Sequence, residues 1–192
     1  MGEEKKPNTD DLEKGAGQKV DMKKEILSWV FYIGFVLVLT WVIITFVGQR
    51  TRVDGRSMEN TLHNGDNLIV EKLSYRFSDP KRFDIIVFPP TGKKEYYIKR
   101  IIGLPGETVQ IKDGQILING EVYNEKDEFP AITNAGLASE PITVGKGQYF
   151  VLGDNRNNSE DSRHNGMGLV DSDRIVGKLW FTISPWKKIG FV

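Results

Sequence analysis

The chain has 192 residues, enough for one modest domain with an appendage. Its 26 basic residues balance 26 acidic ones, so no overall charge favours a nucleic acid or another highly charged partner. It has no cysteine, which excludes disulfides and a thiol nucleophile, and its two histidines lie outside any tight acidic cluster. We therefore expect neither a metal site nor a cofactor.

The first predicted element is an uncharged apolar segment at residues 26–48, ILSWVFYIGFVLVLTWVIITFVG. At about 1.5 Å per residue it spans the roughly 30 Å hydrocarbon core of a bilayer with some tilt. A buried core helix is an alternative, but such helices usually keep a polar stripe. A cleaved leader is another, yet the segment is long and bulky, and no small-x-small site follows it at once. We predict a transmembrane helix.

The flanks of this segment predict its orientation. Residues 1–25 are charged and poor in apolar residues, which is typical of a disordered tail. The basic residues nearest the segment are Lys14, Lys19, Lys23 and Lys24 before it and Arg50, Arg52 and Arg56 after it. This slight positive-inside bias places the tail in the cytoplasm and residues 49–192 on the extracytoplasmic side of the cell membrane.

Beyond the apolar segment, short apolar runs alternate with turn residues, which is typical of β-strands. Strands are expected at residues 67–73, 83–88, 95–102, 108–123, 148–152 and 174–183. The dipeptides Asp113-Gly114 and Asn119-Gly120 are strong signals for two-residue hairpins. The pattern predicts a mainly β fold, an antiparallel sheet behind a single N-terminal helix. Residues 107–147 are either a small β subdomain or, over residues 124–147, a surface excursion.

The stretch GRSMENTLHNGD, residues 55–66, contains a candidate nucleophile, Ser57. A serine hydroxyl is weakly nucleophilic near neutral pH and needs a base. The two histidines, His63 and His164, lie in polar turn-rich stretches that are more typical of solvated loops than of catalytic groups. A different kind of base is therefore needed if Ser57 is catalytic.

A candidate base lies in EYYIKRII, residues 95–102. In an extended strand the side chains alternate between faces, so Lys99 shares a face with Tyr97 and Ile101 while Arg100 points the other way. If Lys99 is buried, desolvation lowers its pKa from about 10.4 by the roughly 3 units that a base near neutrality requires. A lysine on an edge strand that faces water stays charged, and the alternation leaves both arrangements open.

The stretch GDNRNNSEDSRHNG, residues 153–166, is dense in hydrogen-bonding side chains and nearly free of apolar ones. It is either a plain polar loop or a hydrogen-bonded loop that braces a site. Two ion pairs are available within it, Asp154 with Arg156 and Asp161 with Arg163.

Three stretches occur in order behind one membrane anchor: GRSMENTL, YIKRIIGLPGE and GDNRNNSEDSR. Together they resemble type I signal peptidases, the membrane-bound Ser/Lys endopeptidases that remove signal peptides from exported proteins. The short chain with one anchor is similar to the Gram-positive forms, and the resemblance covers nearly all of residues 26–184. It implies cleavage after small residues in the A-x-A pattern through an acyl-enzyme, without metal or cofactor. The implied partners are precursor proteins and the lipid bilayer, with no nucleic acid.

The resemblance also implies roles for individual residues. Ser57 matches the nucleophile, Lys99 the general base, and Ser159 the serine whose hydroxyl orients that lysine. The backbone N–H of Ser57 matches one oxyanion donor; some members add a hydroxyl two residues earlier, where this chain has Gly55 and only backbone to offer. The residues that match those holding the site together are Asp154, Arg156, Asp161 and Arg163. The implied walls of the shallow substrate pockets are Val53, Met58, Leu62, Leu68, Val87, Tyr97 and Ile98.

Three positions depart from the pattern of the family. Asn60 stands where proline is usual, Phe83 where glycine is usual, and Asn157 where aspartate is common. None of them belongs to the Ser/Lys dyad. Asn60 is expected to loosen the turn after the nucleophile, and Phe83 to alter the strand beside the substrate.

Other interpretations make different predictions. A self-cleaving, repressor-type Ser/Lys protease does not account for the anchor or the GDNR stretch. A membrane-tethered β module that binds precursors without cutting them predicts loss of the serine or the lysine, and both are present. A pilin- or conjugation-specific peptidase differs in substrate and not in chemistry. The aromatic residues Trp180, Phe181 and Trp186 are candidates for contact with the membrane interface, although core packing is their more ordinary use.

Overall fold

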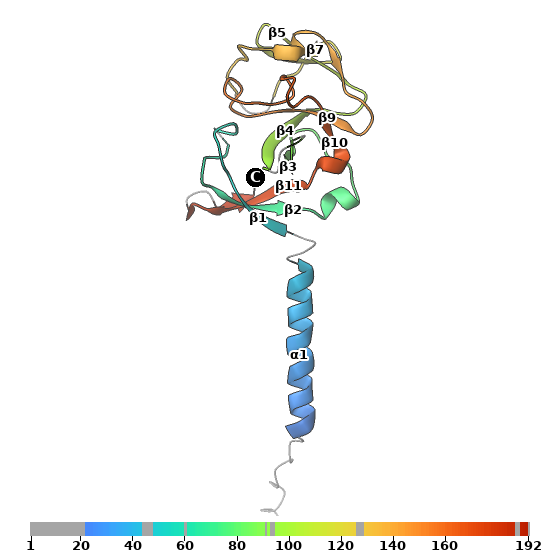
Figure 1. Cartoon of the computed structure of the whole chain (residues 1–192), viewed down its shortest axis with the longest axis vertical. Helices are drawn as coiled ribbons and strands as arrows, with labels where there is room; N and C mark the ends of the chain where they lie inside the picture. The colour runs from blue at the N-terminus through green and yellow to red at the C-terminus, as the bar shows by residue number, and fades with distance from the viewer. Residues whose placement is uncertain are drawn as a thin grey trace, which may run out of the picture. The chain divides into compact units, whose positions relative to one another are not determined.

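The computed structural model describes residues 22–43, 48–59, 61–90, 92, 95–125, 129–186 and 189–191. They divide into a helical unit that ends at Trp41 and a β unit that begins at Val42, drawn in Figure 1. Most of the predicted tail, residues 1–21, lies outside the described residues.

The described part of the helical unit is one helix, α1 (Met22–Val42). Its 21 residues are apolar enough to cross a membrane, and none of its side chains is buried in the protein. The predicted bounds of 26–48 were wrong at both ends, since residues 22–25 are helical and Gly48 already belongs to a strand. Apolarity marks the part of a helix that crosses the bilayer, whereas Lys23, Lys24 and Glu25 are good helix formers that extend it.

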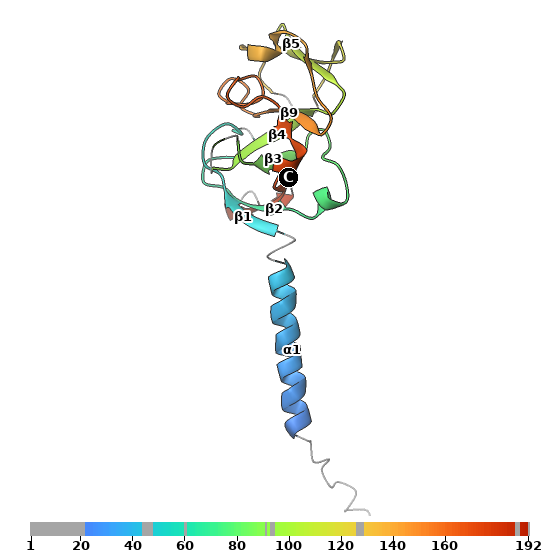
Figure 2. The ribbon, with the colours of Figure 1, turned by 45° about the vertical axis from the view of Figure 1, so that its right-hand side comes forward.

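The β unit is built on an antiparallel sheet in the order β1-β2-β11-β3-β4-β9-β10, with β12 paired to β11 (Figures 1 and 2). The fold is mainly β, as predicted. The strands are β1 (Gly48–Arg52), β2 (Asn67–Glu71), β3 (Ile85–Phe88), β4 (Tyr97–Gly103), β9 (Gln148–Leu152), β10 (Val170–Asp171), β11 (Gly177–Ser184) and β12 (Gly190–Phe191).

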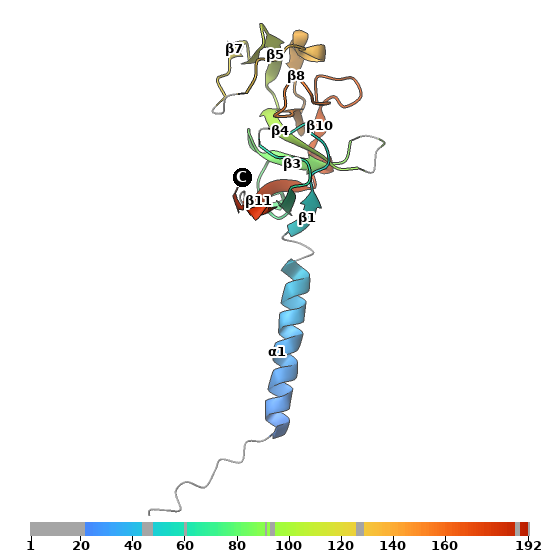
Figure 3. The same ribbon diagram turned by 90° about the vertical axis from the view of Figure 1, so that its left-hand side faces the viewer.

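A second, smaller antiparallel sheet has the order β7-β6-β5-β8 and lies at one end of the β unit (Figure 3). Its strands are β5 (Thr108–Lys112), β6 (Gln115–Ile118), β7 (Glu121–Val122) and β8 (Ile142–Thr143). Both expected hairpin dipeptides form turns with positive φ, 53° at Asp113 and 53° at Asn119. Asparagine and aspartate tolerate this left-handed region better than other residues with a side chain.

Short 3-10 helices complete the β unit: η3 (Ser74–Arg76), η4 (Gly136–Ser139) and η5 (Ser172–Arg174). The expected surface excursion at residues 124–147 thus contains η4 and β8, where it is described.

The core consists of three clusters of buried apolar side chains, and β4 contributes to all three. Ile98 belongs to one cluster, Ile101 to the second, and Ile102 to the third. A strand that borders three cores is covered on both faces, so a charged residue within it is removed from water. This position of β4 creates the environment of Lys99.

Candidate active site

Lys99 lies on an interior strand. β4 pairs with β3 on one side and with β9 on the other, and Lys99 stands opposite Ile86 in the β3–β4 register. Its exposed fraction is 3%. The arrangement with a solvent-facing lysine on an edge strand is therefore wrong, because apolar strands flank β4 on both sides.

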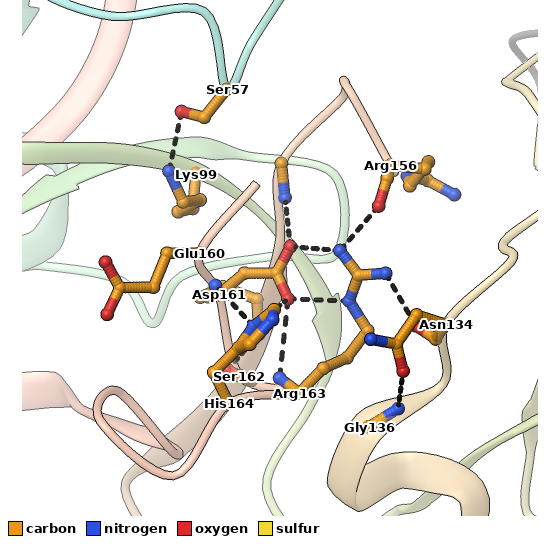
Figure 4. A network of polar contacts seen from close by, with 12 residues as sticks. Ser57, Lys99, Asn134, Gly136, Arg156, Glu160, Asp161, Ser162, Arg163 and His164 are labelled. Atoms are coloured by element: carbon orange, nitrogen blue, oxygen red, sulfur yellow. Dashed lines mark hydrogen bonds and ion pairs between the residues drawn. The ribbon is translucent and has the colours of Figure 1, made fainter. Parts of the chain in front are cut away.

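The side chains of Ser57 and Lys99 meet although 42 residues separate them in sequence. The Lys99 Nζ donates to Ser57 Oγ at 2.7 Å and to the Ile98 carbonyl at 3.1 Å (Figure 4). Ser57 is held in place by its own segment, because the neighbouring Met58 is buried and the Asn155 N–H donates to the Ser57 carbonyl at 3.0 Å. This last contact ties the serine segment, residues 53–59, to the polar loop after β9.

Burial dominates the titration of Lys99. Desolvation lowers its pKa to about 8, while the negative charges of Asp161, Glu160 and Asp154 act in the opposite direction. The Tyr97 ring, with its centroid 5.3 Å from Nζ, covers the same face of the strand as the alternation predicted. With this pKa, roughly one lysine in ten is neutral at pH 7, which is enough to serve as a base.

Two buried ion pairs brace the polar loop 153–166. Asp161 pairs with Arg163, as predicted, and Asp154 pairs with Arg100, which was not predicted. Arg163 pairs with Asp161 through Nε at 2.7 Å and Nη2 at 2.8 Å. Asp161 also accepts from the Gly153 N–H at 3.1 Å, and Arg163 donates to the Arg156 carbonyl at 2.6 Å. Figure 4 shows this network beside the dyad. The loop is thereby fixed against the end of β9.

The expected pair of Asp154 with Arg156 was wrong. Asp154 accepts from Arg100 at 2.8 and 2.7 Å, and from Thr61 Oγ1 at 2.5 Å. Arg156 pairs with Glu125 instead, and its guanidinium lies 4.1 Å from the centre of the Phe129 ring. Arg100 projects from the face of β4 opposite Lys99. It pairs there with Asp154, which lies two residues after the end of the neighbouring strand β9.

Ser159 lies close to the dyad but makes no bond to it. Its Oγ is buried and has no hydrogen-bond partner within the described residues. A methyl group added to Gly153 would collide with this oxygen and with the Ser57 carbonyl, so all three groups are crowded together. The bond from Ser159 to Lys99 that the resemblance implied is absent from this structure.

The backbone N–H of Gly55 is already hydrogen-bonded within its own turn. It donates to Asn64 Oδ1 at 3.0 Å, and the residue adopts a φ of 108° that favours glycine. The turn before Ser57 is therefore stabilised by the Gly55 N–H, which is not directed at a substrate carbonyl. The backbone N–H of Ser57 remains the oxyanion donor to consider.

A cavity of about 510 Å³ opens over the dyad. Four of the seven expected pocket walls line it: Val53, Met58, Tyr97 and Ile98. The other three, Leu62, Leu68 and Val87, are buried behind them in one apolar cluster and support the wall from within. The polar part of the lining was not predicted from the sequence; it includes Thr51, Arg52, Asp54, Arg56, Glu95, Tyr96, Asn158 and Glu160. Thr51 and Arg52 belong to β1, which was not predicted as a strand, so nothing in the sequence indicated that this segment lines the cavity.

Both histidines make contacts within their own loops. The His164 Nδ1 lies 3.8 Å from Asp161, and the backbone N–H of His63 donates to Asp66 at 2.9 Å. Within the described ranges, no three side chains of the His, Cys, Asp and Glu types are grouped as metal ligands would be.

Two of the three departures from the family pattern, Phe83 and Asn157, do not line the cavity. Phe83 has a φ of 72° and packs against Tyr123 of the small-sheet region at 5.7 Å, and it does not line the cavity. The expectation that it alters the strand beside the substrate stays a prediction, since Phe83 stands two residues before β3. Asn157 accepts from Thr133, and Asn60 lies outside the described residues.

Comparisons with known proteins point to one family of peptidases. Residues 26–186 match the family described as signal peptidase, peptidase S26. The signal peptidase I of Bacillus licheniformis is 38% identical over 180 residues, covering 90% of this chain and 96% of that protein. The signal peptidase I T of Bacillus subtilis (strain 168) is 41% identical over 196 aligned positions, covering 98% of each. A crystal structure of a signal peptidase I from Enterococcus faecalis V583 shares 37% identity at a TM-score of 0.45, covering 53% of this chain and 97% of that one.

The family match and the two Bacillus relatives define a serine endopeptidase. More particularly, the chain belongs to the signal peptidase family, peptidase S26, whose members act on precursors that carry signal peptides. The apolar helix α1 is consistent with attachment to a membrane.

Proposed function

We propose that the protein cleaves signal peptides from exported precursors with a catalytic dyad of Ser57 and Lys99. The observation that carries this proposal is the 2.7 Å contact between Lys99 Nζ and Ser57 Oγ, formed by a lysine that is almost fully buried. A buried lysine with a pKa near 8 is a competent base, and Ser/Lys pairs are a known variant of the catalytic triad.

The reaction is acyl transfer in two halves. Neutral Lys99 takes the proton of Ser57 as Oγ attacks the scissile carbonyl carbon. The Ser57 N–H stabilises the oxyanion, a contribution of about 3 kcal/mol for one such donor. The intermediate then collapses, the peptide C–N bond breaks, and the Lys99 ammonium returns its proton to the departing amine. The signal peptide is left as an ester on Ser57. Lys99 deprotonates a water that attacks this ester, the bond to Ser57 Oγ breaks, and the Lys99 ammonium returns the proton to Oγ.

Ser159 is proposed to serve Lys99 during the second half-reaction. When Ser57 is acylated, its Oγ becomes an ester oxygen, which is a weaker hydrogen-bond acceptor for the Lys99 Nζ. The unpartnered Ser159 hydroxyl, which is crowded against Gly153 together with the Ser57 carbonyl, is proposed to orient Nζ at that stage. We expect Ser159→Ala to lower kcat with little change in the free energy of unfolding, because the hydroxyl makes no hydrogen bond in the resting protein.

The substrate is proposed to bind in extended form, with small side chains in the A-x-A pattern. β1 is a terminal strand of its sheet and lines the cavity at Thr51 and Arg52, so a precursor backbone can pair along it. Val53, Met58, Tyr97 and Ile98 leave shallow apolar depressions that suit alanine at the positions beside the cut.

The proposed location is the cell membrane, with the N-terminus in the cytoplasm and the β unit outside. Helix α1 confines enzyme and precursor to one surface and so raises their effective concentration. Trp180 and Trp186 are exposed, and the rings of Trp180, Phe181 and Phe191 contact one another on β11 and β12. Core packing is therefore not the use of the two tryptophans, and contact with the membrane interface is the proposed one.

The test is cleavage of a purified precursor with an A-x-A site by the full chain in detergent. We expect one cut after the second alanine, lost in Ser57→Ala and Lys99→Ala and kept in Lys112→Ala, which changes an exposed lysine of β5. If Lys99→Ala cuts as fast as the wild type, Lys99 is not the base and His63 becomes the candidate. If the folded wild type binds precursor and never cuts it, a tethered binding module is the better interpretation.

A further inference from the structure

Glu160 has a distinct position in the polar loop. Its neighbour Asp161 is fully buried and holds the loop together, whereas Glu160 is exposed and lines the same cavity as Ser57 and Lys99. In Figure 4 its carboxylate points away from the pair of Asp161 with Arg163. Glu160 therefore faces the reaction space and is not part of the ion pair that fixes the loop.

A row of contacts connects Glu160 to the lysine. The Tyr97 hydroxyl donates to Glu160 Oε2 at 3.4 Å, and the Tyr97 ring centroid lies 5.3 Å from Lys99 Nζ. Tyr97 and Lys99 are on the same face of β4, so one tyrosine side chain contacts both the ammonium group, through its ring, and the carboxylate, through its hydroxyl. The carboxylate is thereby held on the cavity wall near the lysine.

We propose that Glu160 is a positioning residue for Lys99, whose negative charge favours the ammonium form and so sets the pH above which the dyad becomes active. The proposal rests on the proposed function, because it requires that Lys99 be the base. Glu160 touches neither the serine nor the reacting carbonyl in this scheme and acts only through the lysine.

Other charges also face Lys99 from the surrounding elements. The polar loop contributes Asp154 and Asp161, each in a two-point pair with an arginine, Arg100 or Arg163. Among the described residues, the remaining titratable or charged groups that line the cavity come from two stretches: Arg52 of β1 with Asp54 and Arg56 after it, and Glu95 and Tyr96 with Tyr97 of β4. Three carboxylates raise the pKa of Lys99, namely Asp161, Glu160 and Asp154. Changing either buried aspartate would break a loop ion pair, so Glu160 is the one of the three to substitute.

The direction of the effect follows from simple electrostatics. Burial lowers the pKa of Lys99 to about 8, and Glu160 is among the negative groups that keep it from falling further. Removing the charge of Glu160 destabilises the ammonium form, so the lysine becomes neutral at lower pH. Because Glu160 is exposed and water screens it, we expect a shift of about half a pH unit.

The experiment measures kcat/KM for precursor cleavage by the full chain in detergent, from pH 6 to pH 9. Glu160→Gln should move the acid limb of the profile down by about half a unit, which makes this variant about threefold faster than wild type at pH 7. Glu160→Lys reverses the charge and should move the limb by about one unit. Glu121→Gln, an exposed carboxylate of β7, is the matched control and should leave the limb unmoved.

A limb of Glu160→Gln that coincides with that of wild type, or moves to higher pH, overturns the inference. A second readout is independent of turnover: NMR titration of Lys99 in the Ser57→Ala background, with and without Glu160→Gln, should show the same downward shift. If Lys99→Ala still cleaves, the dyad itself is wrong. If Lys99→Ala is inactive but Lys99 titrates identically with and without Glu160, the dyad stands and only the role of Glu160 fails.

Discussion

The substitution Gly153→Ala tests how tightly the serine segment is packed. Gly153 directly follows β9, and its φ lies outside the left-handed region, so the backbone conformation itself accepts alanine. The added methyl group would nevertheless overlap the Ser57 carbonyl oxygen and the Ser159 hydroxyl. Any effect of the substitution is therefore steric and is directed at the nucleophile.

The size of the effect follows from the contacts. Carbon needs about 3.5 Å from a neighbouring heavy atom, so the Ser57 backbone must retreat by roughly 1 Å. Such a shift stretches the 2.7 Å contact between Lys99 and Ser57 beyond hydrogen-bonding distance, and also the 3.0 Å bond from the Asn155 N–H. A displacement of about 1 Å at a reacting atom costs about a hundredfold in rate, and overpacking costs about 1–3 kcal/mol of stability.

The assay compares kcat/KM for precursor cleavage and the thermal unfolding of each variant followed by circular dichroism. Gly190→Ala is the matched control, because a methyl group at that glycine of β12 meets no atom within 4 Å. We expect kcat/KM of Gly153→Ala to fall about a hundredfold while the control stays near wild type. A folded Gly153→Ala protein within about threefold of wild-type activity would refute this account of the packing.

Three further predictions use other parts of the structure. The kcat/KM of the wild type should rise with pH to a midpoint near 8, because the neutral form of a lysine whose pKa is lowered to about 8 is the active one; a flat profile from pH 6 to 9 contradicts this. Asp154→Asn should lower the free energy of unfolding by about 3 kcal/mol, because Arg100 is left charged and nearly buried; an unchanged unfolding curve would show that the pair contributes nothing. Phe83→Gly should be more stable than Phe83→Ala by about 1 kcal/mol, because only glycine relieves the φ of 72°; equal stabilities argue against strain there.

The long strands were predictable because their apolar runs are long enough to show. β1 was missed because its sequence, GQRTR, has no apolar pattern. It becomes a strand by pairing with β2 over its whole length, from Gly48 opposite Glu71 to Arg52 opposite Asn67. The two-residue strands β8, β10 and β12 likewise form through pairing with longer neighbours and carry no pattern of their own.

The candidate site was predictable to a different degree at each residue. Side-chain alternation placed Tyr97 beside Lys99, and both are where the pattern put them. The partner of Asp154 was not predictable. Arg156 is the nearer arginine in the sequence, but the observed partner, Arg100, lies on another strand, 54 residues away. Contacts of this kind depend on how loop and sheet pack, which no local pattern records.

The two neighbouring cations of β4 have opposite requirements. In the proposed mechanism Lys99 must be able to lose its proton, whereas the guanidinium of Arg100 remains charged at any physiological pH and pairs with Asp154. A slip of one residue in the pairing of β4 would exchange their faces and present Ser57 with a group that cannot act as a base. A misfolded molecule of this kind would keep a nearly native sheet and be catalytically silent. The strand register sets Lys99 opposite Ile86 and Arg100 opposite Leu152. In the proposed mechanism this register is therefore required for activity as well as for stability.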